Sequence, residues 1–519
     1  MPHTLIPQPQ SITQHSGEFQ LLSSAVISWN GVGSEDVAEL LAEYLRPSTG
    51  FALPVEEGRH GKIVLSCEGS DQTDAAGFVD ESYQLLVNDD GVQCRASNAT
   101  GLARAIQTLR QVFPPEILSD SPSELSWKVP HLEIQDSPRF RWRGQHLDVC
   151  RHFFSVEEVC KFIDLLALHR LNMCHLHLTE DQGWRIEIKK YPRLTEIGSV
   201  RESTLIGHHN DRPRKYDNTP YGGFFTQDDI RTIVSFASRR HITLVPEIDM
   251  PGHMVAAITA YPELGNLNAP AKVRCHWGIS QNVLNVEEST VSFMKDVLDE
   301  VMDLFPGTFI HIGGDEAPKH EWSESHRAQE RMAELGLSSE KELQSWFIQQ
   351  LDEHISGRGR RLIGWDEILE GGLAKGATVM SWRGEKGGLE ATQQGHDVVM
   401  APQQHVYFDY YQSKPKEEEP LAIGGMTELD EVYDYEPIPK EMSELQQKHV
   451  LGSQGQLWTE YMPSMDVVEY MGFPRICALS EVLWLDAEKK DSENFKARLK
   501  AHRQRLAALK VNAHPKPRD

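Results

Sequence analysis

Cysteine is scarce in this chain and is nowhere arranged for cross-linking. The 519 residues contain seven cysteines, and no two of them form a Cys-x-x-Cys pair. A disulfide framework or a cysteine-ligated zinc site needs closely or regularly spaced cysteines. The sequence therefore supports neither kind of cross-link.

Long apolar runs are also missing. No stretch of about 18 apolar residues occurs, and the first residues lack a basic start followed by an apolar core. We therefore expect no transmembrane helix and no membrane partner. The simplest expectation is a cytoplasmic protein, although a chain whose secretory signal had been removed would show the same pattern.

Basic residues are outnumbered by acidic ones. The chain has 52 Lys and Arg against 77 Asp and Glu, which gives a net charge of -25. Such a charge repels nucleic acids and anionic membranes, so neither is an expected partner. It fits a protein that binds a neutral or cationic ligand.

The pattern along the chain predicts two units. Residues 1–135 alternate short β-rich runs with amphipathic segments, one of which, 100–113, has apolar residues at helical spacing. This part is expected to form a small α+β domain. Four prolines, the last of them Pro130, then interrupt regular structure and indicate a boundary. Residues 136–519 form the second predicted unit.

The second unit alternates short apolar strands with longer amphipathic helices. Eight strands in this α/β pattern predict a closed (β/α)8 barrel of the TIM type rather than an open sheet. The strand candidates are 144–149, 173–178, 243–248, 309–312, 361–365, 378–382, 397–401 and 450–457.

Helix ends and loops follow from the same pattern. Capping signals at Ser155, Thr226 and Asn285 are expected to begin helices, and 495–509 is expected to be a closing helix with its basic residues outside. Two long stretches after strands, 187–225 and 410–440, are expected to wall a site. The run Glu417-Glu418-Glu419 in the second stretch is expected to be a solvated flap.

Two adjacent carboxylates follow the fourth predicted barrel strand. In His311-Ile-Gly-Gly-Asp315-Glu316, an apolar run ends in two glycines and then in the acidic pair. Like charges in a confined site push each other's pKa apart, so one acid can stay protonated while the other is ionised. Such a pair suits the cleavage of a glycosidic bond.

The later strand ends are aromatic. Trp365, Trp382, Tyr407 and Trp458 follow four successive predicted strands, and Asp409 and Glu460 accompany them. Aromatic faces pack against the C–H face of a sugar ring, and carboxylates accept hydrogen bonds from its hydroxyls. We therefore predict a sugar-binding pocket at the carboxyl ends of the barrel strands.

Six segments carry a specific resemblance to a known family. They are Arg143-Gly-x-x-x-Asp148-x-x-Arg151-His-Phe-Phe, His175-Leu-His-Leu-x-x-Asp-Gln-Gly-Trp-Arg185, Pro246-Glu-Ile-Asp-Met-Pro-Gly-His253, His311-Ile-Gly-Gly-Asp-Glu316, Gly364-Trp-Asp-Glu-Ile368 and Leu457-Trp-Thr-Glu460. In this order, over residues 138 to about 485, they resemble the family 20 glycoside hydrolases, the β-N-acetylhexosaminidases. Residues 1–135 resemble, with weaker motifs, the small domain that precedes the barrel in that family.

The resemblance implies a retaining exo-β-N-acetylhexosaminidase that removes terminal N-acetylglucosamine or N-acetylgalactosamine residues, with no cofactor or metal ion. The family is an exception to the two-carboxylate scheme, because the 2-acetamido oxygen of the substrate attacks the anomeric carbon and forms an oxazolinium ion. Glu316 would be the general acid and then the general base. Asp315 would hydrogen-bond the acetamido N–H.

The same carry-over implies further site residues. The substrate-binding residues would be Arg151, Trp365, Trp382, Tyr407, Asp409, Trp458 and Glu460, with Glu180 and His253 behind Glu316 and tuning it. One position departs from the family pattern, because Glu180 stands where many members carry aspartate. The charge is kept, but the added methylene changes the geometry of a contact with His253.

Two other functions remain open at this point. His175 and His177, with His253 and Asp315, could hold zinc in a metal-dependent amidohydrolase on the same barrel. A sugar-binding homologue without turnover is the second alternative, although both acids and Arg151 are present. The protein is expected to be a monomer or a homodimer that takes a carbohydrate as its only partner.

Overall fold

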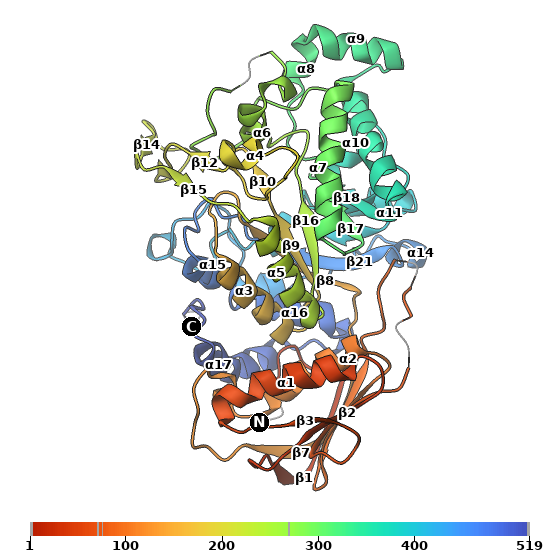
Figure 1. Cartoon of the computed structure of the whole chain (residues 1–519), viewed down its shortest axis with the longest axis vertical. Coiled ribbons are helices and arrows are strands. Elements are labelled where there is room, and N and C mark those ends of the chain that lie inside the picture. The colour runs from red at the N-terminus through yellow and green to blue at the C-terminus, as the bar shows by residue number, and fades with distance from the viewer. Residues whose placement is uncertain (1–3, 70–71, 75, 268–269, 516–519) are drawn as a thin grey trace.

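The computed structural model describes residues 4–515 except 70, 71, 75, 268 and 269. Two units lie one above the other along the long axis of the molecule (Figure 1). The N-terminal unit contains a seven-stranded sheet, and the larger unit is a closed barrel of eight strands. The predicted barrel, preceded by a small α+β unit, is therefore confirmed.

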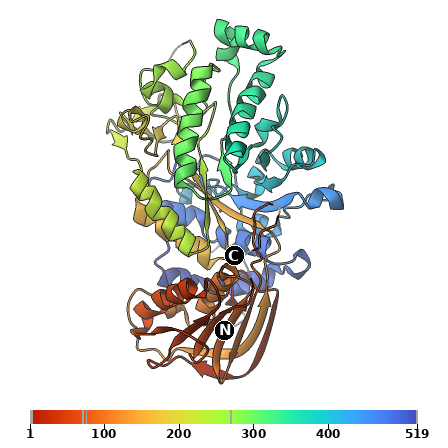
Figure 2. The same ribbon diagram turned by 45° about the vertical axis from the view of Figure 1, so that its right-hand side comes forward.

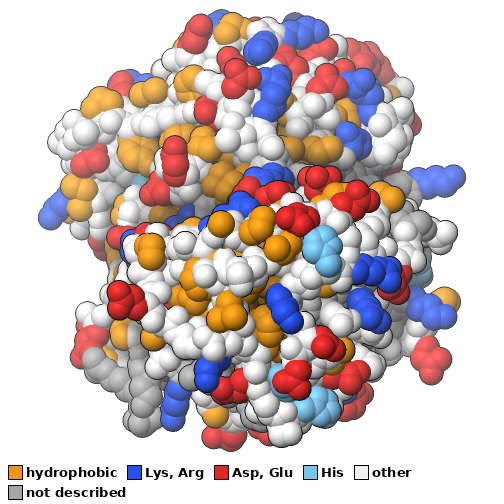
Figure 3. All heavy atoms as spheres, turned by 60° about the horizontal axis from the view of Figure 1, so that its bottom comes forward, with side chains coloured by type: hydrophobic (Ala, Val, Ile, Leu, Met, Phe, Trp, Pro, Cys, Tyr) orange, Lys and Arg blue, Asp and Glu red, His pale blue; other side chains and the backbone are white. Residues whose placement is uncertain are grey.

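The N-terminal sheet has the strand order β1-β7-β5-β6-β4-β2-β3. Its strands are β1 (Ser11–Gln20), β2 (Ile27–Asn30), β3 (Val55–Glu57), β4 (Ile63–Cys67), β5 (Tyr83–Asn88), β6 (Gly91–Ala96) and β7 (Lys128–Asp136). Two helices, α1 (Ser34–Thr49) and α2 (Ala99–Val112), lie between this sheet and the barrel (Figures 1 and 2). Figure 3 turns toward the viewer the end of this unit that points away from the barrel. Acidic, basic and apolar side chains are mixed on that surface.

The prediction that Pro130 interrupts regular structure was wrong. Pro130 lies inside β7, opposite Glu18 of β1. Proline lacks the N–H that a central strand needs, but it is tolerated beside a bulge or where a neighbouring strand has ended. The β1–β7 register shifts between Gln14 and Glu18, and the pairing of β7 with β5 ends at Leu132. The proposed division after residue 135 falls at the end of β7.

The barrel strands all run parallel, and each overlaps its predicted range. They are β8 (Trp142–Asp148), β9 (Met173–His177), β16 (Thr243–Glu247), β17 (Phe309–His311), β18 (Arg361–Trp365), β19 (Thr378–Ser381), β20 (Val398–Met400) and β21 (Val450–Gly455). β21 pairs with β8 and closes the barrel. Because every strand points the same way, all eight carboxyl ends meet at one rim.

Helices surround the barrel. The longer ones are α3 (Val156–Leu168), α5 (Gln227–Arg239), α7 (Glu288–Leu304), α9 (His326–Leu335), α10 (Glu340–Gly357), α11 (Glu385–Gln393), α15 (Met465–Gly472), α16 (Arg475–Trp484) and α17 (Ser492–Ala508). The short ones include α4 (Arg193–Glu196), α6 (Val255–Ala260), α8 (His320–Glu324), α12 (Gln403–Val406), α13 (Leu429–Asp434) and α14 (Glu444–Gln447). Within the described part of the chain, no helix has the length and apolar character needed to cross a membrane.

Two of the three predicted helix starts are confirmed. Ser155 and Thr226 each form a complete capping box with the acid three residues later. Asn285 does not cap a helix, because α7 begins at Glu288 after Glu287. The Asn285 side chain instead accepts hydrogen bonds from the Glu287 N–H and the Thr290 hydroxyl, which orders the loop ahead of the helix.

The closing helix was predicted with its basic residues outside, and for two of them this was wrong. In α17, Arg498 and Arg505 are buried. Arg498 donates to both carboxylate oxygens of Glu481 in α16, at 2.6 and 2.7 Å. Arg505 donates to backbone oxygens of Thr4 and Gln111. These partners come from distant parts of the chain, so the helix pattern could not reveal them.

A buried carboxylate joins the two units. Glu81, just before β5, accepts from Arg104 of α2 and from Arg143 of β8, each at 2.5 Å. Asn172 also donates to it, at 3.0 Å. Burial opposes ionisation, but the two guanidinium groups outweigh it and lower the pKa of Glu81 to about 2.

We expect Glu81→Ala to lower the free energy of unfolding by about 3–5 kcal/mol at pH 7, because Arg104 and Arg143 would stay buried without their shared acceptor. Urea unfolding measures this. Glu43→Ala is the matched control, because Glu43 also crosses between the units, to Arg239, but on the surface, with side chains 47% and 46% exposed. That control should cost about 1 kcal/mol or less.

The effect of Glu81 should depend on pH. A depressed pKa stabilises the fold above the ordinary value of 4.5, and this contribution is lost as the pH falls towards about 2. The difference in the free energy of unfolding between the parent and Glu81→Ala should therefore become smaller as the pH falls over that range. A difference that is equally large at low pH would contradict the ionic origin of the effect.

Candidate active site

A cavity of about 360 Å³ opens at the carboxyl ends of the barrel strands. Every site residue named from the sequence lines it: Arg151, Glu180, His253, Asp315, Glu316, Trp365, Trp382, Tyr407, Asp409, Trp458 and Glu460. Each of the eight barrel strands leads to at least one of these residues. A larger cavity of about 520 Å³ lies between α17 and the stretch 412–430, but no tryptophan, tyrosine or phenylalanine is among the described residues that line it.

Two glycines deliver the acidic pair into this cavity. β17 ends at His311, and Gly313 and Gly314 then turn the chain with positive φ angles of 65° and 96°. A Cβ on Gly313 would lie 1.7 Å from Oδ1 of Asp249, so no side chain fits there. The turn brings Asp315 and Glu316 to the rim, with side chains 13% and 32% exposed.

Asp315 is in an environment that opposes its charge. Burial raises the pKa of Asp315 to about 6; Glu316 adds to this rise, and His253 opposes it. Burial and the neighbouring Asp315 also hold the pKa of Asp249 well above its ordinary value. Asp249 also accepts a hydrogen bond from the Gly314 N–H at 3.3 Å. Its side chain therefore holds the glycine turn that precedes Asp315.

Glu180 connects the acidic pair to the rest of the site. One of its oxygens lies 2.8 Å from Nδ1 of His253, and the other lies 3.0 Å from Nη2 of Arg151. Nε2 of His253 lies 3.6 Å from carboxylate oxygens of both Asp315 and Glu316. The Glu180–His253 contact is thus present despite the longer side chain. Burial disfavours the Glu180 charge, but Arg151 and His253 hold its pKa well below the usual range.

A buried network that sequence analysis did not assign to the site continues below Glu180. His177 lies with Nε2 3.1 Å from Glu180 and Nδ1 2.6 Å from Glu247. Glu247 accepts from the indole N–H of Trp365 at 2.8 Å and lies 3.0 Å from His311. The network therefore supports the carboxyl rim from inside the barrel. His152 contacts the Thr459 carbonyl, 2.6 Å from its Nδ1.

Aromatic side chains form the walls. The rings of Trp365 and Trp458 lie 5.8 Å apart and are tilted, and Trp382 and Tyr407 are stacked at 6.1 Å. The Trp382 indole donates to Glu367 at 3.0 Å. Burial, and then Asp315, raise the pKa of Glu367 to about 8. Glu367 was not predicted as a site residue, although it stands in the quoted Gly364–Ile368 segment.

Several buried polar atoms around the cavity have no hydrogen-bond partner among the described residues. They are Oδ1 of Asp315, Oδ1 of Asp409, Oε2 of Glu460 and Nε of Arg151. Burying such an atom unpaired costs about 1–3 kcal/mol. Their presence in one cavity indicates a place for a ligand rich in hydroxyl and amide groups.

The long loops contribute as expected, and one further loop was missed. His209 comes from the stretch 187–225, and Tyr410 and Ile423 come from 410–440. Gly278 and Ile279 also line the cavity, from the stretch between α6 and α7. The length of that stretch was the feature of the sequence that could have predicted its contribution to the cavity. In the flap, Glu417 and Glu418 are exposed as predicted, but the Glu419 side chain is 5% exposed and pairs with His514 at 2.9 Å.

The histidines proposed for an amidohydrolase are held by carboxylates. His175 and His177 both contact Glu247, at 3.1 and 2.6 Å, and His253 contacts Glu180. Close groups such as His177, Glu180 and Asp249 could hold a metal ion by their spacing. The hydrogen bonds of His177 and His253 to these carboxylates give the same side chains a role in orienting the rim.

Comparison with known proteins supports one family throughout the chain. Residues 140–487 match the model of the glycosyl hydrolase family 20 catalytic domain, and residues 2–137 match that of domain 2 of the same family. The chain is 44% identical to the beta-hexosaminidase of Porphyromonas gingivalis over 98% of this chain, and 36% identical to that of Vibrio furnissii over 92%. It covers 64% and 76% of those relatives.

A solved structure agrees with these matches. The N-acetyl-beta-hexosaminidase of Streptomyces plicatus, in complex with Thio-NAglucal, superposes with a TM-score of 0.85 at 32% identity. The match covers 99% of this chain and 97% of that one.

We expect Gly313→Ala to be more disruptive than the same change at Gly336. Both glycines have positive φ, 65° and 69°, so both share a strain of about 1–2 kcal/mol. Only Gly313 adds the clash with Asp249, because a Cβ on Gly336 meets nothing within 4 Å. The free energy of unfolding should fall by about a further 1–3 kcal/mol for Gly313→Ala, measured by urea unfolding. Equal losses would show that the Gly313 turn has room to move.

Proposed function

The chain belongs to glycosyl hydrolase family 20, and on that basis we propose that it is a retaining exo-β-N-acetylhexosaminidase. It removes terminal, non-reducing N-acetylglucosamine or N-acetylgalactosamine residues from a carbohydrate. The 2-acetamido group of the substrate serves as the nucleophile. The substrate is the only partner that this proposal needs, whether the protein is a monomer or a homodimer.

The arrangement of Asp315 and Glu316 carries the proposal. In the two-carboxylate scheme, the acids flank the scissile bond from separate positions. Here they are adjacent residues, and both lie 3.6 Å from the same nitrogen of His253. Asp315 is deeper than Glu316 and has an unpaired oxygen. This arrangement suits one acid that transfers protons and one that holds a nucleophile belonging to the substrate.

The first step cleaves the glycosidic bond. Glu316 gives its proton to the leaving oxygen as the bond from that oxygen to the anomeric carbon breaks. The acetamido oxygen forms a new bond to the anomeric carbon, which gives an oxazolinium ion. Asp315, as a carboxylate, accepts the acetamido N–H and stabilises the positive charge.

The second step restores the enzyme. Glu316, now ionised, takes a proton from water, and the water oxygen bonds to the anomeric carbon as the bond to the acetamido oxygen breaks. Two inversions at the anomeric carbon give net retention. His253 and Glu180 act through Glu316 and Asp315, because their contacts set the local charge on both acids.

The remaining residues bind the sugar. Arg151 suits the 3- and 4-hydroxyls, because its planar donor fork is held by Asp148 at 3.1 Å and by Glu180. Asp409 and Glu460 accept from ring hydroxyls with their unpaired oxygens. Trp365, Trp382 and Trp458 enclose the acetamido methyl group and the sugar face, and Tyr407 donates to the acetamido oxygen.

The proposal is tested by comparing an aryl β-N-acetylglucosaminide with the aryl β-glucoside that lacks the acetamido group. We expect turnover of the first only, since the second has no internal nucleophile. Glu316→Gln should reduce turnover of the first by about two or more orders of magnitude and largely retain binding. Equal turnover of both glycosides would exclude acetamido participation, and unchanged turnover of Glu316→Gln would exclude its acid role. A parent that binds the sugar without turnover would be a sugar-binding homologue.

Asp315→Asn should weaken an inhibitor that mimics the intermediate. A thiazoline analogue is expected to bind at least about tenfold less tightly, because a hydrogen bond to a charged group is lost. The glutamine variant at Glu316 serves as the control, since it keeps Asp315. Equal inhibition of Asp315→Asn and parent would contradict the assigned role.

The same variant should change the pH profile. Asp315, which interacts electrostatically with Glu316, His253, Asp249, Glu247 and Glu367, has a raised pKa of about 6 and so is ionised above that pH. The kcat/KM of the parent should fall as the pH drops through about 6, and Asp315→Asn should lose this limb. A limb that persists in the variant would belong to another group.

A further inference from the structure

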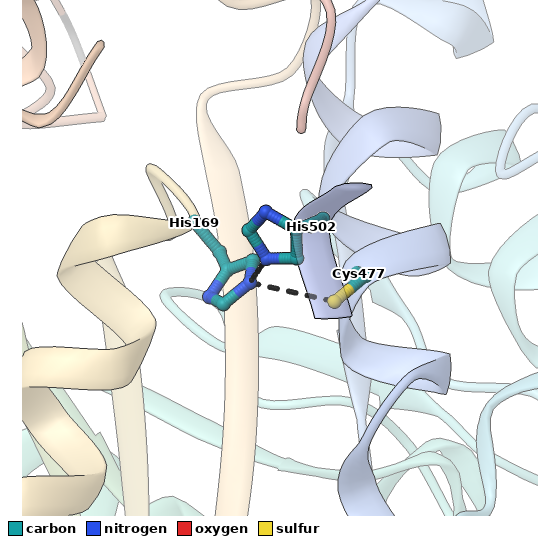
Figure 4. Close-up of side chains that lie close together, drawn as sticks. All are labelled: His169, Cys477 and His502. Atoms are coloured by element: carbon teal, nitrogen blue, oxygen red, sulfur yellow. Dashed lines mark hydrogen bonds between the residues drawn. The ribbon is translucent and has the colours of Figure 1, made fainter. Parts of the chain in front are cut away.

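Three side chains that can bind a metal ion lie close together (Figure 4). None of them lines the cavity that contains Asp315 and Glu316. His169 follows α3, Cys477 lies in α16 and His502 lies in α17. All three are 0% exposed. Nε2 of His169 lies 2.9 Å from Nε2 of His502 and 3.4 Å from Sγ of Cys477. The catalytic proposal uses none of them.

Hydrogen bonding alone leaves this cluster unsatisfied. Nδ1 of His169 donates to the Leu165 carbonyl at 2.7 Å, which leaves one lone pair on Nε2. Both His502 Nε2 and Cys477 Sγ lie within reach of that single lone pair. In addition, Nδ1 of His502 has no partner among the described residues. Buried polar groups that the protein leaves unsatisfied commonly mark a water or an ion.

The spacing of the three atoms suits metal ligation. A metal ion lies about 2.0–2.3 Å from imidazole nitrogen and thiolate sulfur, so two such ligands stand about 3–4 Å apart. The separations of 2.9 and 3.4 Å are close to this range. The Leu165 contact also orients the His169 ring with Nε2 towards the cluster, as an outer hydrogen bond does for a ligating histidine.

We propose that His169, Cys477 and His502 form a buried site for a d10 metal ion that accepts sulfur and nitrogen ligands, Cu⁺ or Zn²⁺. A thiolate with two imidazoles is a ligand set that these ions prefer. On binding, the Cys477 thiol releases its proton to solvent, and the thiolate bonds to the metal. The Nε2 proton of His502, which can donate to Nε2 of His169 when no metal is bound, moves to Nδ1, which has no partner among the described residues.

The electrostatic surroundings are consistent with neutral imidazole ligands. Burial, with Arg170 contributing, lowers the pKa of His169 to about 4, and burial holds that of His502 well below its usual range. Burial also raises the pKa of Cys477, so the metal must displace its proton. Metal affinity should therefore rise with pH.

The expected role is to fasten the closing helices. The site would link the end of α3 to α16 and α17. Leu168 of α3 and Trp484 of α16 also pack in the apolar core of the N-terminal unit. None of the three ligands lines the cavity that contains Asp315 and Glu316, so metal binding should stabilise the fold without changing turnover. The site therefore stands or falls independently of the proposed hydrolase activity.

The test is the metal content of the full-length protein. The chain is produced in medium supplemented with zinc in one arm and copper in the other, purified without an affinity tag, dialysed, and analysed for bound metal per chain. We expect about one ion per chain in at least one arm. Cys477→Ala and His502→Gln should each retain at least tenfold less. Cys160→Ala is the matched control, because Cys160 is another buried cysteine, on α3, and it should keep the parent's content.

Thermal unfolding supplies the second readout. The melting temperature of the parent and of Cys160→Ala should rise on metal loading, whereas those of Cys477→Ala and His502→Gln should not. If either Cys477→Ala or His502→Gln fails to fold, the other variant tests whether the site binds metal. An intense thiolate-to-cobalt absorption in the Co²⁺-loaded parent, lost in Cys477→Ala, would identify the cysteine ligand. Absence of metal from the parent in both arms, or equal content in parent and folded variants, would overturn the proposal.

Discussion

The pairing of β21 with β8 closes the barrel, and the site depends on that closure. The two strands meet in parallel register from Gly452 opposite Trp142 to Gly455 opposite Gln145. A Cβ on Gly452 would lie 1.8 Å from the Trp142 carbonyl oxygen, so glycine permits the close approach. Closure brings Arg151, which follows β8, beside Glu460, which follows β21, at 3.8 Å. Residues at opposite ends of the barrel sequence thereby become neighbours in one pocket.

Charge is distributed unevenly across that pocket, and burial is the cause. A carboxylate that burial removes from water has a raised pKa unless a cation compensates. Glu180 is compensated by Arg151 and by two histidines, and it stays ionised. Asp315, Asp409 and Glu460 are compensated less, and their pKa values are raised. The rim thus offers one fixed anion behind the acids and several acceptors that a bound ligand can satisfy.

Local sequence patterns predicted the elements of the fold better than their surroundings. All eight barrel strands were found within a few residues, because buried parallel strands are short apolar runs. Pro130, Asn285 and Arg498 were misjudged for a common reason. Each was read by its local preference, whereas a bulge in β1, a hydrogen bond to Thr290 and a pairing with Glu481 decided its position. The predicted site residues line one cavity because they follow strands, whose ends share one rim.

By itself the sequence determined which residues reach the carboxyl rim, since strand period and motif order are local properties of the chain. It also carried the family resemblance. Tertiary structure alone decided which groups touch: Glu180 with both Arg151 and His253, Glu247 with Trp365, and His169 with His502. The last pair is 333 residues apart in sequence. The pKa of a buried acid and the ligands of a metal depend on atoms within a few ångströms, and only the folded chain sets those distances.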